Sequence, residues 1–182
     1  MRIAVITPAV PERFEMLREA LESVRAQSLP PFLHLVGVDY ERAGLSEMLN
    51  RLAGAAIAAG AEWVVQLDDD DLLDPAHLET LARHAPGADV VYSYCRVTGR
   101  DWDPNSPFDP DRLLRENYIP SNALVRASLL ADLDGWRSGR GHEDWDLWLR
   151  ALHSGARFVS VPEVTWTYRF HGANMSLVRA DT

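Results

Sequence analysis

Four consecutive aspartates at the end of a short apolar run most constrain what this 182-residue chain can fold into. The apolar run, Trp63 to Leu67, is typical of a buried strand, and Asp68 to Asp71 follow it without a break. Beyond the acids, Asp74 suits the N-cap of a helix and Pro75 suits its first position. The sequence therefore predicts that the acids lie at the C-terminal edge of a sheet, where open α/β folds bind ligands.

The spacing of these acids predicts their chemistry. Alternate side chains of extended backbone share a face, so we expect Asp68 and Asp70 to point one way and Asp69 and Asp71 the other. Two carboxylates about 4 Å apart repel by several kcal/mol. A hard cation such as Mg²⁺ or Mn²⁺ that bridges to substrate phosphates removes that repulsion. A solvated acidic loop that only favours a helix start is the alternative, and the strand before the acids and the helix after them favour a site.

The N-terminal part of the chain alternates between strand-like and helical patterns. Strands are predicted over residues 3–6, 32–38 and 63–67, and helices over residues 12–27 and 45–59. This βαβαβ order predicts a parallel sheet with right-handed crossovers. Thr7, Asp39 and Asp68 each follow one of these strands, so we expect all three at one edge of the sheet, within reach of a single ligand.

The rest of the chain has weaker patterns. They predict strands over residues 89–97, 158–161 and 165–170, an extended segment over 121–126, and helices over 75–84, 110–117, 127–133 and from 143 onward. Trp166, Tyr168 and Phe170 alternate along the last strand, and we expect that aromatic face in the core. We expect Trp102, in the irregular segment 98–110, to pin that segment to the core rather than to stack on a sugar, and His77 to be a surface or cap residue.

Composition limits the partners and the location of the chain. A net charge of −9, from 18 basic and 27 acidic residues, argues against nucleic acid or an anionic membrane as the main partner. The single cysteine, Cys95, excludes an internal disulfide and lies in an apolar run, which is typical of a buried thiol. No secretory signal is visible, and the apolar window 52–65 is too short and too polar to span a bilayer. We expect a cytoplasmic protein without a transmembrane segment, and peripheral attachment to a membrane stays open.

A second acidic group occupies the first turn of the helix predicted from Glu143. Glu143, Asp144 and Asp146 lie in this turn, where the helix dipole favours acids, and we expect Asp146 to pair with Arg150. The same dipole is expected to lower the pKa of Asp144. Three glycines within residues 135–141 predict a mobile loop directly before the helix.

In chain order, these motifs resemble those of the family 2 inverting glycosyltransferases of the GT-A fold, over nearly the whole chain. The opening Thr7-Pro8 and the helix after it are similar to the start of that family, and Asp68 to Asp71 resembles its metal-binding D-x-D. The segment Gly141 to Arg150 resembles its E-D helix, about 70 residues further on, and the end Tyr168-Arg169-x-His171 resembles its closing strand.

The resemblance implies a metal-dependent enzyme that moves a sugar, with inversion, from a nucleoside-diphosphate sugar to an acceptor hydroxyl. The implied site residues are Thr7, Pro8, Asp39, Asp68 and Asp69 for the nucleotide-sugar, Asp70 and His171 for Mn²⁺ or Mg²⁺, Asp144 as the base, and Glu143 to orient the acceptor. The implied fold is one α/β domain over residues 1–182, with a GT-A (Rossmann-like), mostly parallel sheet flanked by helices. Residues 1–97 would form its nucleotide-sugar half, and residues 98–182 its acceptor and catalytic-base half.

The chain departs from the family pattern after Asp39. Tyr40-Glu41-Arg42 stands where the family has an acidic D-G-S-T-D run, and the segment before Gly44 is short. The donor nucleotide therefore stays open among UDP, GDP and TDP. The sugar and the acceptor also stay open, and the acceptor could be a glycan, a lipid-linked molecule or a small molecule.

Two other functions fit part of the same pattern. A nucleotidyltransferase or sugar-nucleotide pyrophosphorylase also pairs acids with a metal, but it would have a Gly-rich, basic loop near its start, and Thr7 to Pro11 contains no Gly or Lys. A non-catalytic nucleotide-sugar binding module would not need both the acid run and the Glu143-Asp144 pair.

Overall fold

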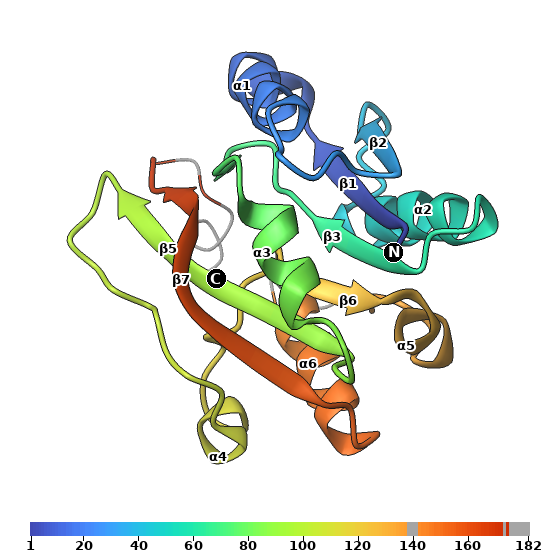
Figure 1. Cartoon of the computed structure of the whole chain (residues 1–182). Coiled ribbons are helices and arrows are strands. Elements are labelled where there is room, and N and C mark those ends of the chain that lie inside the picture. The colour runs from blue at the N-terminus through green and yellow to red at the C-terminus, as the bar shows by residue number, and fades with distance from the viewer. Residues whose placement is uncertain (138–141, 173, 175–182) are drawn as a thin grey trace.

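The computed structural model describes residues 1–137, 142–172 and 174 (Figure 1). Its strands are β1 (Ile3–Ala9), β2 (Leu33–Val38), β3 (Trp63–Gln66), β4 (Leu72–Leu73), β5 (Val90–Thr98), β6 (Leu124–Arg126) and β7 (Phe158–Arg169). Within the described residues, these seven strands form one sheet in the order β2-β1-β3-β6-β5-β7-β4. β6 is antiparallel to both of its neighbours and β4 is antiparallel to β7, whereas the other pairs are parallel.

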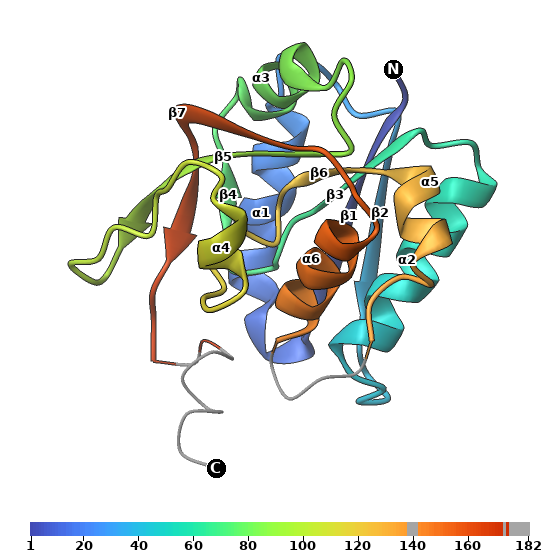
Figure 2. The same ribbon diagram turned by 90° about the horizontal axis from the view of Figure 1, so that it is seen from below.

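Helices cover both faces of this sheet. They are η1 (Pro11–Arg13), α1 (Phe14–Arg25), α2 (Leu45–Ala58), α3 (His77–His84), α4 (Pro110–Leu113), α5 (Ala127–Asp132) and α6 (Glu143–His153). Figure 2 shows the sheet between α1 and α3 on one side and α2, α5 and α6 on the other. The result is a three-layer α/β/α arrangement.

The apolar pattern of β1 explains why two layers of helices are needed. Ala4 and Ile6 pack with the cluster that includes α2, α5 and α6, whereas Ile3 and Val5 pack with the cluster that includes α1 and α3. Because alternate side chains point to opposite faces, a strand that is apolar at every position must be buried on both.

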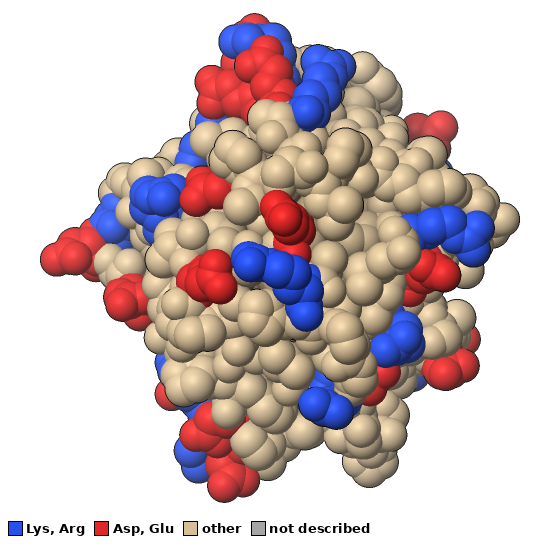
Figure 3. Space-filling model, in the orientation of Figure 1, with Lys and Arg blue, Asp and Glu red and all other residues tan. Residues whose placement is uncertain are grey.

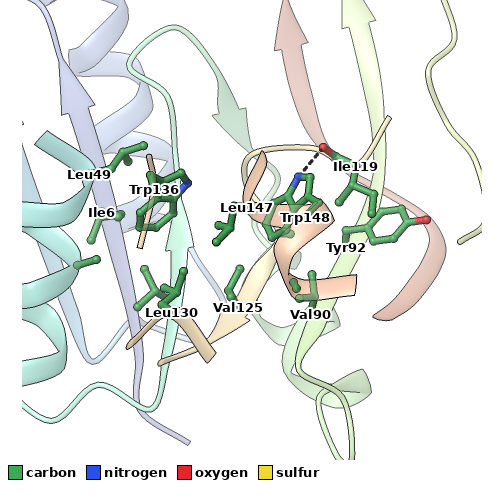
Figure 4. Packing of buried hydrophobic residues seen from close by; sticks show 14 of the residues in the cluster. Ile6, Leu49, Val90, Tyr92, Ile119, Val125, Leu130, Trp136, Leu147 and Trp148 are labelled. Atoms are coloured by element: carbon green, nitrogen blue, oxygen red, sulfur yellow. Dashed lines mark hydrogen bonds between the residues drawn. The ribbon is translucent and has the colours of Figure 1, made fainter. Parts of the chain in front are cut away.

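The acidic helix α6 packs into the larger core cluster. Trp148 of α6 is fully buried, and its Nε1 donates to the carbonyl oxygen of Ile119 over 3.2 Å (Figure 4). Leu147 and Trp136 lie in the same cluster. Burial of an aromatic side chain of this size contributes several kcal/mol to the free energy of folding. This packing holds α6 in place.

The predicted fold class and most of the predicted elements are confirmed, with several differences at the ends of elements. β1 extends to Ala9, whereas we expected it to end before Thr7 and Pro8. The backbone groups of Ile6 point toward β3, and those of Ala9 point toward β2. Pro8 is two residues after Ile6, so its backbone nitrogen also points toward the β3 side. Because β3 has already ended there, the missing N–H of Pro8 costs no hydrogen bond of the sheet. The expected helix start at Asp74 is wrong, because Leu72–Leu73 pairs with β7 as a strand and the helix begins at His77.

The C-terminal part of the sheet also differs from the sequence patterns. The two strands expected over residues 158–170 are one strand, β7, whose pairing with β5 is irregular near Tyr94. The expectation of a wholly core aromatic face is wrong: Trp166 is buried, but Tyr168 and Phe170 are half-buried and line a cavity. His77 is completely buried against Thr165, not on the surface, and Cys95 is buried as predicted.

Nothing in the described residues spans a membrane as a helix, because none of their helices is both long and apolar enough.

Candidate active site

A cavity of about 570 Å³ opens at the edge of the sheet where the parallel strands end. The ends of β1, β2, β3, β5 and β7 contribute to its wall, as does the segment that precedes the antiparallel β6. Asp70 from the acid run and Asp144 from α6 both line it, together with Pro8, Asp39 and Glu143. The two acidic groups, about 70 residues apart in sequence, therefore share one cavity at the position typical of ligand sites in α/β folds.

The four acids form a tight turn and not an extended run, so their expected alternation is wrong. The backbone N–H of Asp71 donates to the carbonyl oxygen of Asp68, which closes the turn. Asp68 receives hydrogen bonds from Gln66 and Ser121, over 2.7 and 3.0 Å. Burial and the neighbouring Asp70 raise the pKa of Asp68 to about 7 despite these hydrogen bonds.

Arg13 lies between two of the acids. Its Nη1 is 2.8 Å from Oδ1 of Asp69 and 2.8 Å from Oδ2 of Asp70. The second oxygen of Asp69 accepts the backbone N–H of Val10 over 2.9 Å. Asp69 therefore holds η1 against the acid turn, and its expected contact with a nucleotide-sugar stays a prediction.

The end of β7 approaches the acid turn from the other side. The backbone N–H of Arg169 donates to Asp71 over 2.9 Å, and the guanidinium of Arg169 donates to the carbonyl oxygen of Asp70 and to Glu19. His171 Nε2 lies 3.1 Å from Oδ2 of Asp70. The structure thus brings together the two residues that the sequence proposes as metal ligands.

The donor chemistry of Asp70 and His171 suits Mn²⁺ or Mg²⁺, which accept carboxylate oxygens and, for Mn²⁺, imidazole nitrogen. The described residues contain no cluster of three or more His, Cys, Asp or Glu that could hold an ion by itself. Two protein ligands are nevertheless enough for a cation that keeps several waters and binds substrate phosphates.

Two residues expected to bind the nucleotide-sugar form hydrogen bonds to other parts of the protein through their side chains. Thr7 is completely buried, does not line the cavity, and its hydroxyl pairs with His34 over 2.9 Å. Asp39 lines the cavity, but its two oxygens accept the backbone N–H groups of Ala43 and Gly44, over 2.8 and 2.9 Å. The hydrogen bond from Gly44 is the main reason that the pKa of Asp39 is lowered.

Asp144, the predicted base, lies in the first turn of α6 beside Glu143. Its Oδ1 accepts from Asn117 Nδ2 over 3.1 Å and from the backbone N–H of Trp145 over 2.8 Å. The pKa of Asp144 is raised, chiefly by burial. Our expectation of a lowered pKa is wrong, because desolvation outweighs the helix dipole and these hydrogen bonds. The glycine loop expected before α6 falls largely on residues 138–141, which lie outside the described residues.

Sequence patterns missed several residues of the cavity wall. Arg13, Asn117 and Ser121 belong to no motif, and each meets its aspartate across 27 to 57 positions of the chain. Trp102 is 47% exposed at the cavity, with its ring 6.0 Å from that of Tyr168. The alternation of aromatic residues along the last strand identifies the face that carries Tyr168. It does not indicate whether that face lines the cavity or the core.

Comparisons with known proteins found similarity in sequence and in fold. No protein-family model matches the chain. A curated relative from Bacillus subtilis (strain 168), the uncharacterized glycosyltransferase YwdF, is 27% identical over 179 residues, which cover 90% of this chain and 65% of the relative.

Two solved structures share the fold. S. aureus TarS 1-349 in complex with UDP-GlcNAc matches 97% of this chain and 61% of its own, with a TM-score of 0.77 and 18% identity. The mannosyltransferase PcManGT from Pyrobaculum calidifontis, in complex with GDP-Man and Mn²⁺, matches 96% of this chain and 58% of its own, with a TM-score of 0.72 and 19% identity. The chain therefore has the fold of a solved mannosyltransferase and spans less than two thirds of the length of each of these relatives.

Proposed function

We propose that this chain is a metal-dependent, inverting glycosyltransferase that moves a sugar from a nucleoside-diphosphate sugar to an acceptor hydroxyl. The supporting observation is the single cavity lined by both Asp70 and Asp144. A glycosyltransferase relative by name, and fold neighbours whose complexes contain UDP-GlcNAc or GDP-Man with Mn²⁺, support the same class of donor. In this proposal, residues 1–97 bind the donor, and residues 98–182 bind a glycan, lipid-linked or small-molecule acceptor and supply the base.

The acid turn would hold the diphosphate end of the donor. Asp70 and His171 would bind a divalent cation, which, when bound, stabilises the negative charge of the departing nucleoside diphosphate as a Lewis acid. Arg13 shares Oδ2 of Asp70 with His171, so it adds positive charge at the same place. Asp39, directly after β2, also lines the cavity, and a base or ribose would lie beside it.

Asp144 would accept the proton of the acceptor hydroxyl. The hydroxyl oxygen attacks the anomeric carbon from the face opposite the leaving group, so a new C–O bond forms while the bond to the phosphate oxygen breaks and its electron pair leaves with the nucleotide. General-base assistance of this kind is worth roughly 10²–10⁴-fold. Because burial raises the pKa of Asp144, turnover should fall, as the pH is lowered, at a higher pH than for an ordinary aspartate.

Thermal unfolding with UDP, GDP and TDP, each with and without MnCl₂, tests the donor class. We expect one nucleotide to raise the melting temperature in a Mn²⁺-dependent way, because ligands that bind only the folded state stabilise it. No shift with any nucleotide, with or without metal, would contradict the proposal.

Asp144→Asn tests the base. We expect loss of turnover by at least about 100-fold, measured as nucleotide release from UDP-GlcNAc or GDP-mannose, with the nucleotide-induced melting shift retained. Asp146→Asn is the matched control, since Asp146 lies on the same helix but pairs with Arg150 and does not line the cavity. Loss of nucleotide binding in Asp144→Asn would mean that Asp144 is not the base.

A further inference from the structure

One short segment, residues 117–121 between α4 and β6, connects the two acidic parts of the cavity. At its start, Asn117 Nδ2 donates to Oδ1 of Asp144 over 3.1 Å. At its end, the Ser121 hydroxyl donates to Oδ2 of Asp68 over 3.0 Å. All five residues of the segment line the cavity.

The middle of this segment is anchored in the core. Tyr118 and Ile119 are buried, and the carbonyl oxygen of Ile119 accepts from Trp148 Nε1 (Figure 4). The Tyr118 hydroxyl donates to the carbonyl oxygen of Asp109 over 2.9 Å and accepts the N–H of Asp109 over 2.7 Å. These contacts fix the backbone from which Asn117 reaches Asp144, and they tie it to α6 itself.

The hydrogen bonds of Asp144 are unequally divided between its two oxygens. Oδ1 accepts both the Asn117 amide and the backbone N–H of Trp145. Both of these hydrogen bonds end on Oδ1, and neither uses Oδ2. A carboxylate held by one oxygen keeps its plane fixed and presents the other oxygen as a proton acceptor.

We propose that Asn117 is a positioning residue that holds Asp144 by Oδ1, so that Oδ2 receives the proton of the acceptor hydroxyl. This inference rests on the proposed role of Asp144 as the base. Asn117 itself touches neither proton nor sugar in this scheme, and it acts through the orientation and basicity of Asp144.

The groups that act on Asp144 make the effect of removing Asn117 predictable. Burial, and to a smaller extent the neighbouring Glu143, raise the pKa of Asp144, whereas the Asn117 amide and the N–H groups of Trp145 and Asp144 lower it. Loss of the neutral amide donor removes a favourable contact with the ionised form. The pKa of Asp144 should then rise, and its carboxylate should gain rotational freedom.

Asn117→Ala tests the inference first without any substrate. A ¹³C NMR titration of the Asp144 carboxyl, assigned by its absence in Asp144→Asn, should show a higher pKa in Asn117→Ala than in the wild type. Asn117→Asp should raise that pKa further, because it places a carboxylate against Oδ1. Arg115→Ala is the control on the same stretch of chain: Arg115 is exposed and does not line the cavity, so the titration should be unchanged.

Turnover of UDP-GlcNAc or GDP-mannose then tests the role in the reaction. We expect kcat of Asn117→Ala to fall by about 10- to 100-fold, with the acidic limb of the pH–rate profile shifted upward and the nucleotide-induced melting shift unchanged. Asn117→Gln, which keeps an amide donor, should recover part of the lost kcat.

The possible failures are distinguishable. If Asp144→Asn keeps its turnover, the proposed base is wrong, whatever Asn117 does. If Asp144→Asn is inactive while Asn117→Ala keeps the wild-type kcat, pH–rate profile and Asp144 pKa, the positioning role is overturned and the proposed function stands.

Discussion

Arg13 places one guanidinium between two nearly buried carboxylates. Asp69 is 3% exposed and Asp70 is 6% exposed, so neither charge is well solvated. Nη1 of Arg13 lies 2.8 Å from each of them, which offsets part of their mutual repulsion in the absence of a cation. A metal ion held by Asp70 would take over part of that role, because a cation would also offset the charge of this carboxylate.

Replacement of this arginine should therefore destabilise the protein mainly when metal is absent. For Arg13→Gln we expect a loss of about 2–4 kcal/mol in the free energy of unfolding without metal, since two buried carboxylates lose the guanidinium between them. MnCl₂ should recover a larger share in the variant than in the wild type. Urea unfolding with and without MnCl₂ measures both effects. Arg18→Gln, which removes two exposed ion pairs on the following helix α1, should change stability by less than about 1 kcal/mol. Equal losses in both variants would contradict this account.

The connection from α5 to α6 begins as a docked segment and not as a free loop. Asn50 of α2 and the backbone of Trp136 exchange two hydrogen bonds, of 2.7 and 2.9 Å. Arg150 of α6 donates to the carbonyl oxygen of Gly135. This docking joins α2, α5 and α6 at the rim of the cavity, which Trp136 lines.

Gly135 is required for this docking. Its φ is +65°, and a Cβ there would lie 2.2 Å from Oδ1 of Asn50. Gly135→Ala should therefore cost about 2–4 kcal/mol, from backbone strain and the lost hydrogen bonds. Gly54→Ala, in the interior of α2 with nothing within 4 Å of its Cβ, should instead stabilise by about 0.5–1 kcal/mol. Urea unfolding gives both values, and a neutral Gly135→Ala would show that the segment is not held as described.

The whole molecule carries an excess of acid, but this excess is not spread as one patch over the face shown in Figure 3, where acidic and basic side chains alternate. Several aspartates are instead gathered in the cavity wall. Buried groups at the sheet should contribute to the pH dependence of stability, and His77 is one of them. This imidazole is completely buried between α3 and β7, and its Nδ1 pairs with Thr165 over 2.8 Å.

His77 should make the protein less stable in acid. Burial lowers its pKa from 6.5 to about 4, so between these values the unfolded chain binds a proton that the folded chain does not. Its contribution is complete above pH 6.5 and is lost as the pH falls to about 4, by roughly 3 kcal/mol in total. Urea unfolding of wild type and His77→Gln across this range isolates the contribution as a difference. A difference that does not change with pH would show that the fold does not lower the pKa of His77.

Local sequence patterns predict those features of this protein that depend on residues close together in the chain. The apolar runs of β1 and β3, the helices between them and the acids at the end of β3 follow from side-chain periodicity and turn residues, which act over a few positions. The order βαβαβ then places Asp39 and Asp68 at one edge, because parallel strands joined by right-handed crossovers end on the same side.

Only the tertiary structure determines which side chains contact the acids. The antiparallel β6 between β3 and β5 brings Ser121 to Asp68, η1 brings Arg13 to Asp70, and the segment after α4 brings Asn117 to Asp144. These partners are 27 to 57 residues apart, and no local propensity encodes which of many polar side chains will be placed there. The alternation expected for the four aspartates failed for the same reason: hydrogen bonds and ion pairs to distant segments stabilise a turn where local periodicity favoured an extended strand.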